Sequence, residues 1–387
     1  MVKLNNPTWI FEKNTQKLIA TLGADNMRFV GGCVRNHLLE MHTDDIDIAT
    51  ILEPEAVIKK LSESGIKVIP TGLDHGTVTA IIEKNHYEIT TLRTDIECHG
   101  RHAEVAYINC WEEDAKRRDF TINALYADMD GNITDYFGGI DDIKQGLIRF
   151  IGNPEERIKE DGLRILRFFR FYAYYGKTKP VDADIAAIFK LKQCVSELSG
   201  ERIQAEMFKL LAADNMLSVF LEMHELGVLA EIELDIKSLS LPNDLPKTKP
   251  IVFLASVIEK NSANKLVERW KLSNKNKKLL LFLTSNNIPK NADNLTLKKA
   301  IRSNGKSQFM DLCFVSYASG EISNTEYQNA INLAENWDIP EFPIKANDLM
   351  QVGFEEGKKL GQTLKALEIK WENSDYKMSK KELLKTL

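Results

Sequence analysis

The chain has 387 residues, with 51 Lys and Arg against 56 Asp and Glu, a formal net charge of −5 at pH 7 and 43% hydrophobic residues. This length excludes a single small module and predicts two to four domains, each able to bury a core. No apolar run approaches the roughly 20 residues of a bilayer span, and the N-terminal residues lack the apolar core of a secretory signal. We therefore expect a cytoplasmic protein with no membrane partner.

Five scattered cysteines without a C-x-x-C pair predict free thiols. Cys98, His99 and His102 form the one Cys/His cluster of the sequence. They are expected to be loop residues rather than zinc ligands, because a fourth ligand is missing.

Short strands are expected in the first third of the chain, where apolar residues alternate or form brief runs between turn residues. These predicted strands span residues 27–30, 46–49, 77–83, 87–92 and 104–108. From about residue 144 the strand pattern fades and the chain to residue 387 is expected to be helical. Asn153 followed by Pro154 is a strong helix start, and one helix is predicted over residues 155–175. Loops rich in Asn, Asp and Pro are expected at residues 241–250, 286–294 and 338–343.

A glycine pair follows the first predicted strand. A helix is expected to begin directly after Gly31 and Gly32. Two glycines let the backbone approach a ligand closely, and the free amides at a helix start favour anions. The segment therefore predicts a phosphate-binding turn. It matches neither the Walker A pattern nor G-x-G-x-x-G, which disfavours nucleotide hydrolysis and dinucleotide redox chemistry.

Two aspartates occupy alternate positions of the second predicted strand. The side chains of Asp45 and Asp47 are expected on one face, while Ile46 and Ile48 point into the core. Adjacent carboxylates repel each other unless a cation neutralises them, and Mg²⁺ is often shared between carboxylates and substrate phosphates. D-x-D alone is a weak signal. Placed about a dozen residues after a Gly-Gly turn, it resembles the metal motif of the DNA polymerase β-like nucleotidyltransferases, and the resemblance implies a Mg²⁺ site.

A second polar cluster lies in residues 116–125, where Arg118, Asp119 and Asn123 alternate with core residues. Asp119 as the cap of an amphipathic helix is the structural alternative. The functional interpretation is that Arg118 neutralises triphosphate charge, while Asp119 and Asn123 bond to ribose hydroxyls.

The predicted helix 155–175 places Asp161 and Arg164 on one face, with Arg167 and Arg170 along its edge. An ion pair between Asp161 and Arg164 within the helix is the structural alternative. Such a pair stabilises a helix by only about 0.2–0.5 kcal/mol. Stability alone therefore explains the clustered arginines poorly.

In order and spacing these segments resemble the class II tRNA nucleotidyltransferase and bacterial poly(A) polymerase family. The matching motifs, over roughly residues 28–211, are G-G-x-V-R with D-x-D, R-R-D-F-T-x-N-A, D-Y-F-G-G-I-D, E-D-x-x-R and E-R-I. The resemblance implies an α+β fold with a polymerase β-like nucleotidyltransferase head, a mixed β-sheet with helices, followed by an all-α neck, body and tail. The implied divisions are 1–143 for the head with the catalytic carboxylates, 144–215 for the neck that selects the base, and 216–387 for the body and tail that bind tRNA.

The same resemblance implies a role for each matching residue. Asp45 and Asp47 would be catalytic and would hold Mg²⁺. Asp161 and Arg164 would read the incoming base, because a carboxylate beside a guanidinium complements the amino donor and ring nitrogen of C and A. The residues that would bind the nucleotide as a whole are Gly31, Gly32, Arg35, Arg118, Asp119, Asn123, Asp161, Arg164, Arg167 and Arg170.

Three features qualify the resemblance. Asn36 stands where the family usually has Asp, which weakens the charged support of Arg35. Glu88 is either a third carboxylate of the site or a solvated strand residue. Residues 93–102 resemble the family's flexible loop needed for the final A step, which disfavours an enzyme that adds only CC.

The implied activity is addition of C, C and A to the 3′ end of tRNA from CTP and ATP, with tRNA and no DNA as partner. The alternatives are a poly(A) polymerase, a partial CC- or A-adding enzyme, or a non-catalytic RNA-binding protein. Eleven Lys and Arg against two acidic residues give the stretch 265–306 a net charge of +9. Lys275, Lys277 and Lys278 within it are predicted to contact RNA phosphates, although a solvated helix face is the plain alternative.

Overall fold

The structure, a computed structural model, describes residues 2–43, 45–99, 102–237, 241–242 and 244–387, and for 95–99 and 102–105 the backbone alone. The chain divides into two compact units. The first comprises Met1–Leu234 with Arg269–Lys271, and the second comprises Asp235–Glu268 with Leu272–Leu387. The finer division into head, neck, and body with tail stays a prediction.

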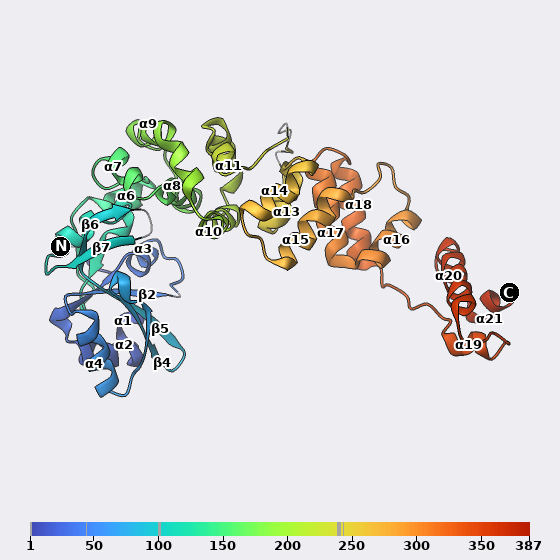
Figure 1. Cartoon of the computed structure of the whole chain (residues 1–387), viewed down its shortest axis with the longest axis horizontal. Coiled ribbons are helices and arrows are strands. Elements are labelled where there is room, and N and C mark those ends of the chain that lie inside the picture. Colours follow the sequence, from blue (N-terminus) through green and yellow to red (C-terminus); the bar gives the residue numbers. More distant parts are fainter. Residues whose placement is uncertain (1, 44, 100–101, 238–240, 243) are drawn as a thin grey trace. The chain divides into compact units, whose positions relative to one another are not determined.

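A mixed seven-stranded sheet organises the first part of unit 1, and Figure 1 labels its strands β2, β4 and β5. The strand order is β3-β4-β5-β2-β1-β8-β9. β2 and β5 run parallel, and every other neighbouring pair is antiparallel. The strands are β1 Met27–Val30, β2 Ile46–Thr50, β3 Lys67–Gly72, β4 Thr77–Ile82, β5 Asn85–Thr91, β8 Leu125–Ala127 and β9 Ile133–Asp135. A separate two-stranded sheet pairs β6 Arg93–His99 with β7 His102–Tyr107.

Alternating burial fixes which face of each strand enters the core. In β4, for example, Val78, Ala80 and Ile82 are buried while the residues between them are half-buried. The helices and 3-10 turns that accompany this sheet are α1 Thr8–Phe11, α2 Lys13–Leu22, η1 Ala24–Asn26, α3 Gly32–Leu38, α4 Pro54–Glu63, η2 Leu73–His75, α5 Trp111–Lys116, η3 Thr121–Asn123 and α6 Gly139–Gln145.

All five predicted strands are present within about two residues of their expected bounds. Four strands escaped prediction: β3 contains Pro70 and lies at a sheet edge, β8 and β9 have three residues each, and β6 carries little apolar alternation. The interpretation of Cys98, His99 and His102 as loop residues was wrong, because the first two lie in β6 and the third in β7. Their side chains lie outside the described residues, so their metal-binding capacity stays untested.

Helices form the rest of unit 1. They are α7 Pro154–Glu160, α8 Leu163–Tyr175, α9 Asp182–Leu191, η4 Lys192–Glu197, α10 Gly200–Leu211, α11 Met216–Glu225 and α12 Val228–Glu231. The Asn153 side chain accepts the N–H of Glu155 and so caps α7, as predicted. The expected division into a sheet-bearing first part and a helical remainder is confirmed.

The single helix predicted over residues 155–175 was wrong, because Asp161 and Gly162 separate α7 from α8. Asp161 has extended backbone angles, φ −155° and ψ 108°. Its Oδ1 accepts the N–H of Leu163 at 3.0 Å and so takes up one of the free donors at the start of α8. At Gly162, a Cβ would lie 2.5 Å from the Cys194 carbonyl oxygen, so the close approach of this break to η4 requires glycine.

Unit 2 contains helices and connecting segments, with no strand among its described residues. The C-terminal part of unit 2 has a small hydrophobic core, in which Trp371 lies with Leu349, Leu360 and Leu383. Its helices are α13 Pro250–Val257, η5 Lys260–Ser262, α14 Ala263–Arg269, which ends in unit 1, α15 Asn274–Ser285, α16 Asn294–Asn304, α17 Lys306–Ala318, α18 Asn324–Asn336, α19 Ala346–Met350, α20 Lys358–Asn373 and α21 Lys380–Leu384. Among the described residues of the whole chain, no helix has both the length and the apolar character needed to cross a membrane.

Candidate active site

The glycine turn joins β1 to α3 at the centre of the sheet. Gly31 has φ 68° and ψ −116°, a conformation that residues with a Cβ rarely adopt, and α3 begins at Gly32. A Cβ on Gly32 would lie 3.7 Å from Asp47 Oδ2 and 3.9 Å from Arg35 Nη2. The turn therefore runs directly between a carboxylate and a guanidinium, and its role in phosphate binding stays a prediction.

The carboxylates stand on two neighbouring strands. Asp47 lies on β2 and is paired in register with Glu88 on the parallel strand β5, while Asp45 directly precedes β2 and is exposed. Burial, and then the nearby charges of Glu88 and Asp45, raise the pKa of Asp47 to about 6, although Arg118 and Arg35 oppose the shift. Glu88 thus lies beside Asp47 with an exposed side chain, and its role as a third carboxylate of the site stays a prediction.

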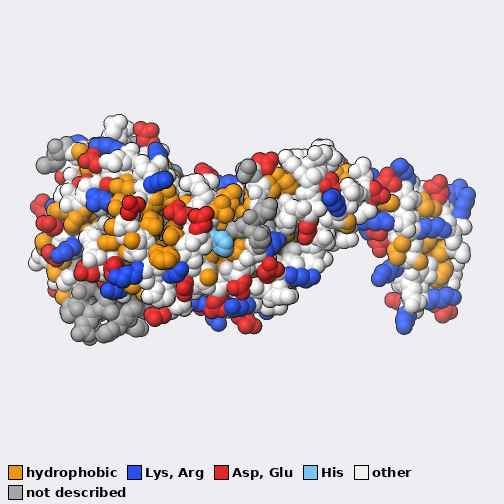
Figure 2. All heavy atoms as spheres, turned by 90° about the horizontal axis from the view of Figure 1, so that it is seen from above, with side chains coloured by type: hydrophobic (Ala, Val, Ile, Leu, Met, Phe, Trp, Pro, Cys, Tyr) orange, Lys and Arg blue, Asp and Glu red, His pale blue; other side chains and the backbone are white. Residues whose placement is uncertain are grey.

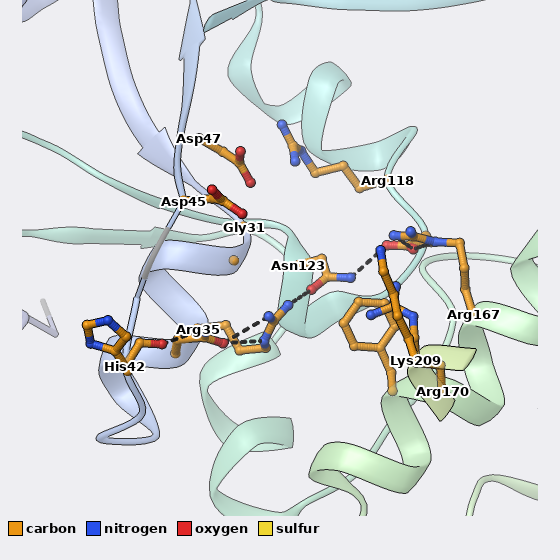
Figure 3. Close-up of a pocket in the computed structure, with 14 residues that line it drawn as sticks. Gly31, Arg35, His42, Asp45, Asp47, Arg118, Asn123, Arg167, Arg170 and Lys209 are labelled. Carbon is orange, nitrogen blue, oxygen red and sulfur yellow. Dashed lines mark hydrogen bonds and ion pairs between the residues drawn. The ribbon is translucent and has the colours of Figure 1, made fainter. Parts of the chain in front are cut away.

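The glycine turn and the two aspartates line a pocket of about 420 Å³ in unit 1. In Figure 3, Asp45 and Asp47 point from the sheet side toward Arg118, while Arg167, Arg170 and Lys209 enter from the helices. The lining residues are Gly31, Gly32, Arg35, Asn36, His42, Asp45, Asp47, Arg118, Asp119, Asn123, Arg167, Arg170, Phe171 and Lys209. The structure thus brings together ten of the twelve residues that the sequence assigned to catalysis or nucleotide binding.

A chain of hydrogen bonds crosses this pocket from α3 to α8 (Figure 3). Arg35 Nη1 donates to Asn123 Oδ1, and Asn123 Nδ2 donates to Asp119 Oδ1 at 2.9 Å. Asp119 Oδ2 accepts Nε of Arg167 at 2.7 Å. Burial alone would raise the pKa of Asp119, but Arg167 and the bonds from Asn123 and from the N–H of Phe120 hold it at about 2. Asp119 is therefore the carboxylate partner of a pocket arginine and not a helix cap.

Arg118 is held from behind by the side chain of Asp114, which is 1% exposed. Asp114 Oδ2 accepts Nη2 of Arg118 at 3.2 Å and Oη–H of Tyr126 at 2.6 Å, and Tyr126 Oη accepts Nε of Arg118. Burial would raise the pKa of Asp114, but Arg118 and Arg117 hold it at about 2. The sequence motif predicted Arg118 but gave no sign of this support.

Helices α8 and α10 supply the remaining cations. Arg170 Nε donates to Glu206 Oε2 of α10 at 2.5 Å, and its guanidinium lies 4.2 Å from the ring centroid of Phe171. Lys209 follows one turn after Glu206 and reaches the same pocket. Sequence reasoning missed Lys209, which only the packing of α10 against α8 brings to the site, and Phe171, which follows Arg170 on α8.

Asp161 and Arg164 lie outside this pocket. Asp161 accepts Nη2 of Arg202 at 2.7 Å and lines a neighbouring cavity of about 290 Å³. Arg164 pairs with Glu160 and donates to the carbonyl oxygens of Arg157 and Arg117. The ion pair considered between Asp161 and Arg164 is therefore replaced by two others, and their role in base selection stays a prediction.

Two carboxylates of this pocket, Asp45 and Asp47, are the candidate metal ligands. Among the described residues, no group of three or more His, Cys, Asp or Glu side chains is placed to hold a metal ion. Asp45 and Asp47 nevertheless fit Mg²⁺, which takes one or two carboxylates and completes its shell with water and substrate phosphates. The raised pKa of Asp47 comes first from burial and then from the nearby charges of Glu88 and Asp45, and a bound cation would relieve the repulsion between these charges.

In the basic stretch 265–306, several cations are already paired with acids that lie elsewhere in the sequence. Arg302 pairs with Glu368 and Glu372 of α20, and Lys298 with Asp375 at 2.7 Å. Lys265 pairs with Asp235, and Arg269 with Glu233. The visible face in Figure 2 accordingly shows Lys and Arg interspersed with Asp and Glu.

Lys275, Lys277 and Lys278 differ from these paired cations. They are exposed in the first turns of α15, and among the described residues no partner holds their side chains. Cations at a helix N-terminus oppose the helix dipole, at about 0.3–1 kcal/mol each. Their placement therefore does not serve the stability of α15.

Comparison with known proteins agrees with this geometry. Residues 27–149 match the poly A polymerase head domain, and residues 185–237 match a probable RNA and SrmB-binding site of polymerase A. The chain is 34% identical to mitochondrial CCA tRNA nucleotidyltransferase 1 of Mus musculus, over 99% of this chain and 92% of that protein. It is 47% identical to the CCA-adding enzyme of Oceanobacillus iheyensis, over 47% of this chain and 45% of that protein. The crystal structure of the Bacillus stearothermophilus CCA-adding enzyme in complex with CTP aligns with a TM-score of 0.71 and 25% identity, covering 94% of each chain. The chain therefore belongs to the CCA-adding tRNA nucleotidyltransferases of the poly(A) polymerase family and is an RNA nucleotidyltransferase.

Proposed function

We propose that this chain adds C, C and A to the 3′ end of tRNA, using CTP and ATP and no nucleic-acid template. The observation that carries the proposal is the pocket in which Asp45 and Asp47 face a set of arginines suited to a triphosphate. The full-length similarity to a CCA tRNA nucleotidyltransferase supports the choice of tRNA as substrate. The expected cytoplasmic location stays a prediction, since the mouse relative is named mitochondrial.

The chemistry is a displacement at the α-phosphate of the nucleotide. The 3′-hydroxyl oxygen of the RNA forms a bond to that phosphorus and loses its proton, while the bond to pyrophosphate breaks. Arg35 and Arg118 bind the triphosphate and compensate the charge that moves onto pyrophosphate. Asp119 and Asn123, fixed by the hydrogen-bonded chain between α3 and α8, hold the ribose edge in one orientation.

Asp45 and Asp47 are the residues proposed to hold Mg²⁺. When bound there, Mg²⁺ supplies polarisation of the attacking hydroxyl and charge stabilisation of the leaving pyrophosphate. Asp45 and Asp47 would supply only some of the ligands of the ion, and substrate phosphates and water would supply the others. Glu88 lies beside Asp47 and contributes negative charge to this site.

Replacement of Asp45 by Ala tests the proposed activity. The assay is primer extension on tRNA that ends before C, after C or after CC, with each nucleotide supplied singly. Wild type should add C, C and A in turn and then stop, while Asp45→Ala should lose at least about 100-fold in rate, because charge stabilisation by a metal contributes several kcal/mol. Continued addition of A would identify a poly(A) polymerase, addition of only C or only A a partial enzyme, and no addition by wild type a non-catalytic RNA-binding protein.

Asp47→Asn should stabilise the metal-free protein at neutral pH. Because the folded-state pKa of Asp47 is raised to about 6, the folded state binds the proton more tightly than the unfolded state, and stability falls as pH rises from about 4 to 6. Asn removes this penalty, so unfolding in EDTA at pH 7.5 should show a gain of about 1–3 kcal/mol that vanishes near pH 3.5. A less stable variant at pH 7.5 would contradict the burial of charge at this position.

Base selection is proposed to depend on Asp161, whose carboxylate is matched to the amino groups of C and A and mismatched to U and G. Asp161→Asn keeps an oxygen that can accept the N–H of Leu163 but loses the charge, whereas Asp161→Ala loses both. Both variants should lose discrimination against UTP by about tenfold or more, because a buried polar site rejects a mismatched edge strongly. If only stability falls and selectivity is retained in both, the role of Asp161 is structural, through its bonds to Arg202 and to the N–H of Leu163.

The exposed lysines of α15 are proposed to contact tRNA phosphates. Changing Lys275, Lys277 and Lys278 together to Glu should raise the KM for tRNA by about tenfold or more and flatten its dependence on salt, with little change in the KM for CTP. The matched control changes three other exposed lysines on α2 and α4, Lys17, Lys59 and Lys60, to Glu. An equal effect of both triple variants would indicate general charge and no localised contact.

A further inference from the structure

Arg35 is a buried cation whose side-chain hydrogen-bond partners are all neutral. Its side chain belongs to a residue that is 7% exposed, and burial lowers the pKa of its guanidinium, with the positive charge of Arg170 adding to the effect and Asp119 opposing it. Its N–H groups donate to Asn36 Oδ1 at 2.9 Å, to Tyr175 Oη at 3.1 Å and to Asn123 Oδ1. Among the described residues, no carboxylate forms an ion pair with it.

The other pocket arginines have carboxylate partners. Arg118 pairs with Asp114, Arg167 with Asp119 and Arg170 with Glu206. A buried charge without a counter-charge costs free energy, so natural proteins seldom retain one without a partner. Arg35 is thus the arginine of this pocket whose charge remains available to a ligand.

Asn36 determines this state. Its Oδ1 accepts two N–H groups of Arg35, and its Nδ2 donates to the carbonyl oxygen of His42 at 3.3 Å. These partners fix the amide orientation, because a guanidinium requires an acceptor and a carbonyl requires a donor. Asn36 therefore holds Arg35 and the segment before β2 together without adding charge.

An aspartate at position 36 would be nearly the same size and would behave differently. One carboxylate oxygen would neutralise Arg35, while the other would face the carbonyl of His42 without a hydrogen to donate. The pocket would lose one unit of positive charge at the place where Gly32 and Arg35 meet.

We propose that Asn36 is an affinity-determining residue, which leaves Arg35 without a counter-charge in the free protein so that a nucleotide phosphate becomes its anionic partner. This inference rests on the proposed nucleotide-binding function of the pocket. It goes beyond that function by assigning the neutral amide a role in how tightly the triphosphate binds and in the stability of the unliganded protein.

Asn36→Asp tests the inference through two measurements: affinity for CTP should fall, while thermal stability without nucleotide should rise. In the absence of tRNA, calorimetric titration with CTP and Mg²⁺ should show a Kd raised by about tenfold, because the new carboxylate competes with phosphate for Arg35. Thermal unfolding without nucleotide should show a higher Tm, because Arg35 then has a counter-charge. An unchanged or lower Kd for CTP would overturn the proposal, whether or not the Tm changes.

Two variants separate charge from structure. Asn36→Ala removes the hydrogen bonds without adding charge, so its Tm should fall while its Kd for CTP stays within about threefold of wild type. Asn109→Asp adds the same charge at an exposed position outside the pocket and should change neither readout. If Asn36→Asp fails to fold, the Tm gain on adding inorganic tripolyphosphate decides instead: it should be as large in Asn36→Ala as in wild type, and its loss would overturn the proposal.

Failure of the proposed function is distinguishable from failure of this inference. If wild type binds neither CTP nor tripolyphosphate, the pocket is not a nucleotide site and both proposals fall. If wild type binds CTP and Asn36→Asp binds it equally well, the pocket assignment stands and the role of Asn36 alone is wrong.

Discussion

The mutual repulsion of four arginines in one pocket is the constraint around which unit 1 is built. Arg35, Arg118, Arg167 and Arg170 line a single cavity of about 420 Å³. Like charges gathered in one cavity destabilise a folded chain unless each is compensated or faces a ligand. The acids that compensate three of them are therefore as much part of the site as the arginines, although they do not point at a substrate.

These acids also connect elements that are distant in sequence. Asp119 precedes η3 and pairs with Arg167 of α8. Glu206 of α10 pairs with Arg170, which also lies on α8. The first ion pair joins the sheet-bearing part of unit 1 to α8, and the second joins α8 to α10. Removing one acid would leave a partly buried guanidinium unpaired and would therefore destabilise unit 1. Site geometry and fold stability are consequently set by the same contacts.

Sequence reasoning succeeded where local chemistry decides the outcome. The Gly31 turn requires a conformation that only glycine adopts readily, and the alternation around Asp47 orients carboxylate and core by the period of a strand. It failed where a contact between distant segments decides. Helical periodicity continues through Asp161, and the break there depends on the approach of Gly162 to η4. Lys209 likewise reaches the pocket only through the packing of α10 on α8, for which a single sequence carries no signal.

The basic stretch shows the same limit for electrostatics. Its net charge of +9 counts residues along the chain, whereas the field that an RNA meets depends on partners in space. The charge of Arg302 is compensated by Glu368 and Glu372, so Arg302 contributes to the contact between α16 and α20 more than to attraction of phosphate. The lysines at the start of α15 have no such partner among the described residues, and their position opposes the helix dipole. Since neither pairing nor helix stability accounts for them, the charge they leave exposed is the part of the stretch most suited to a polyanion.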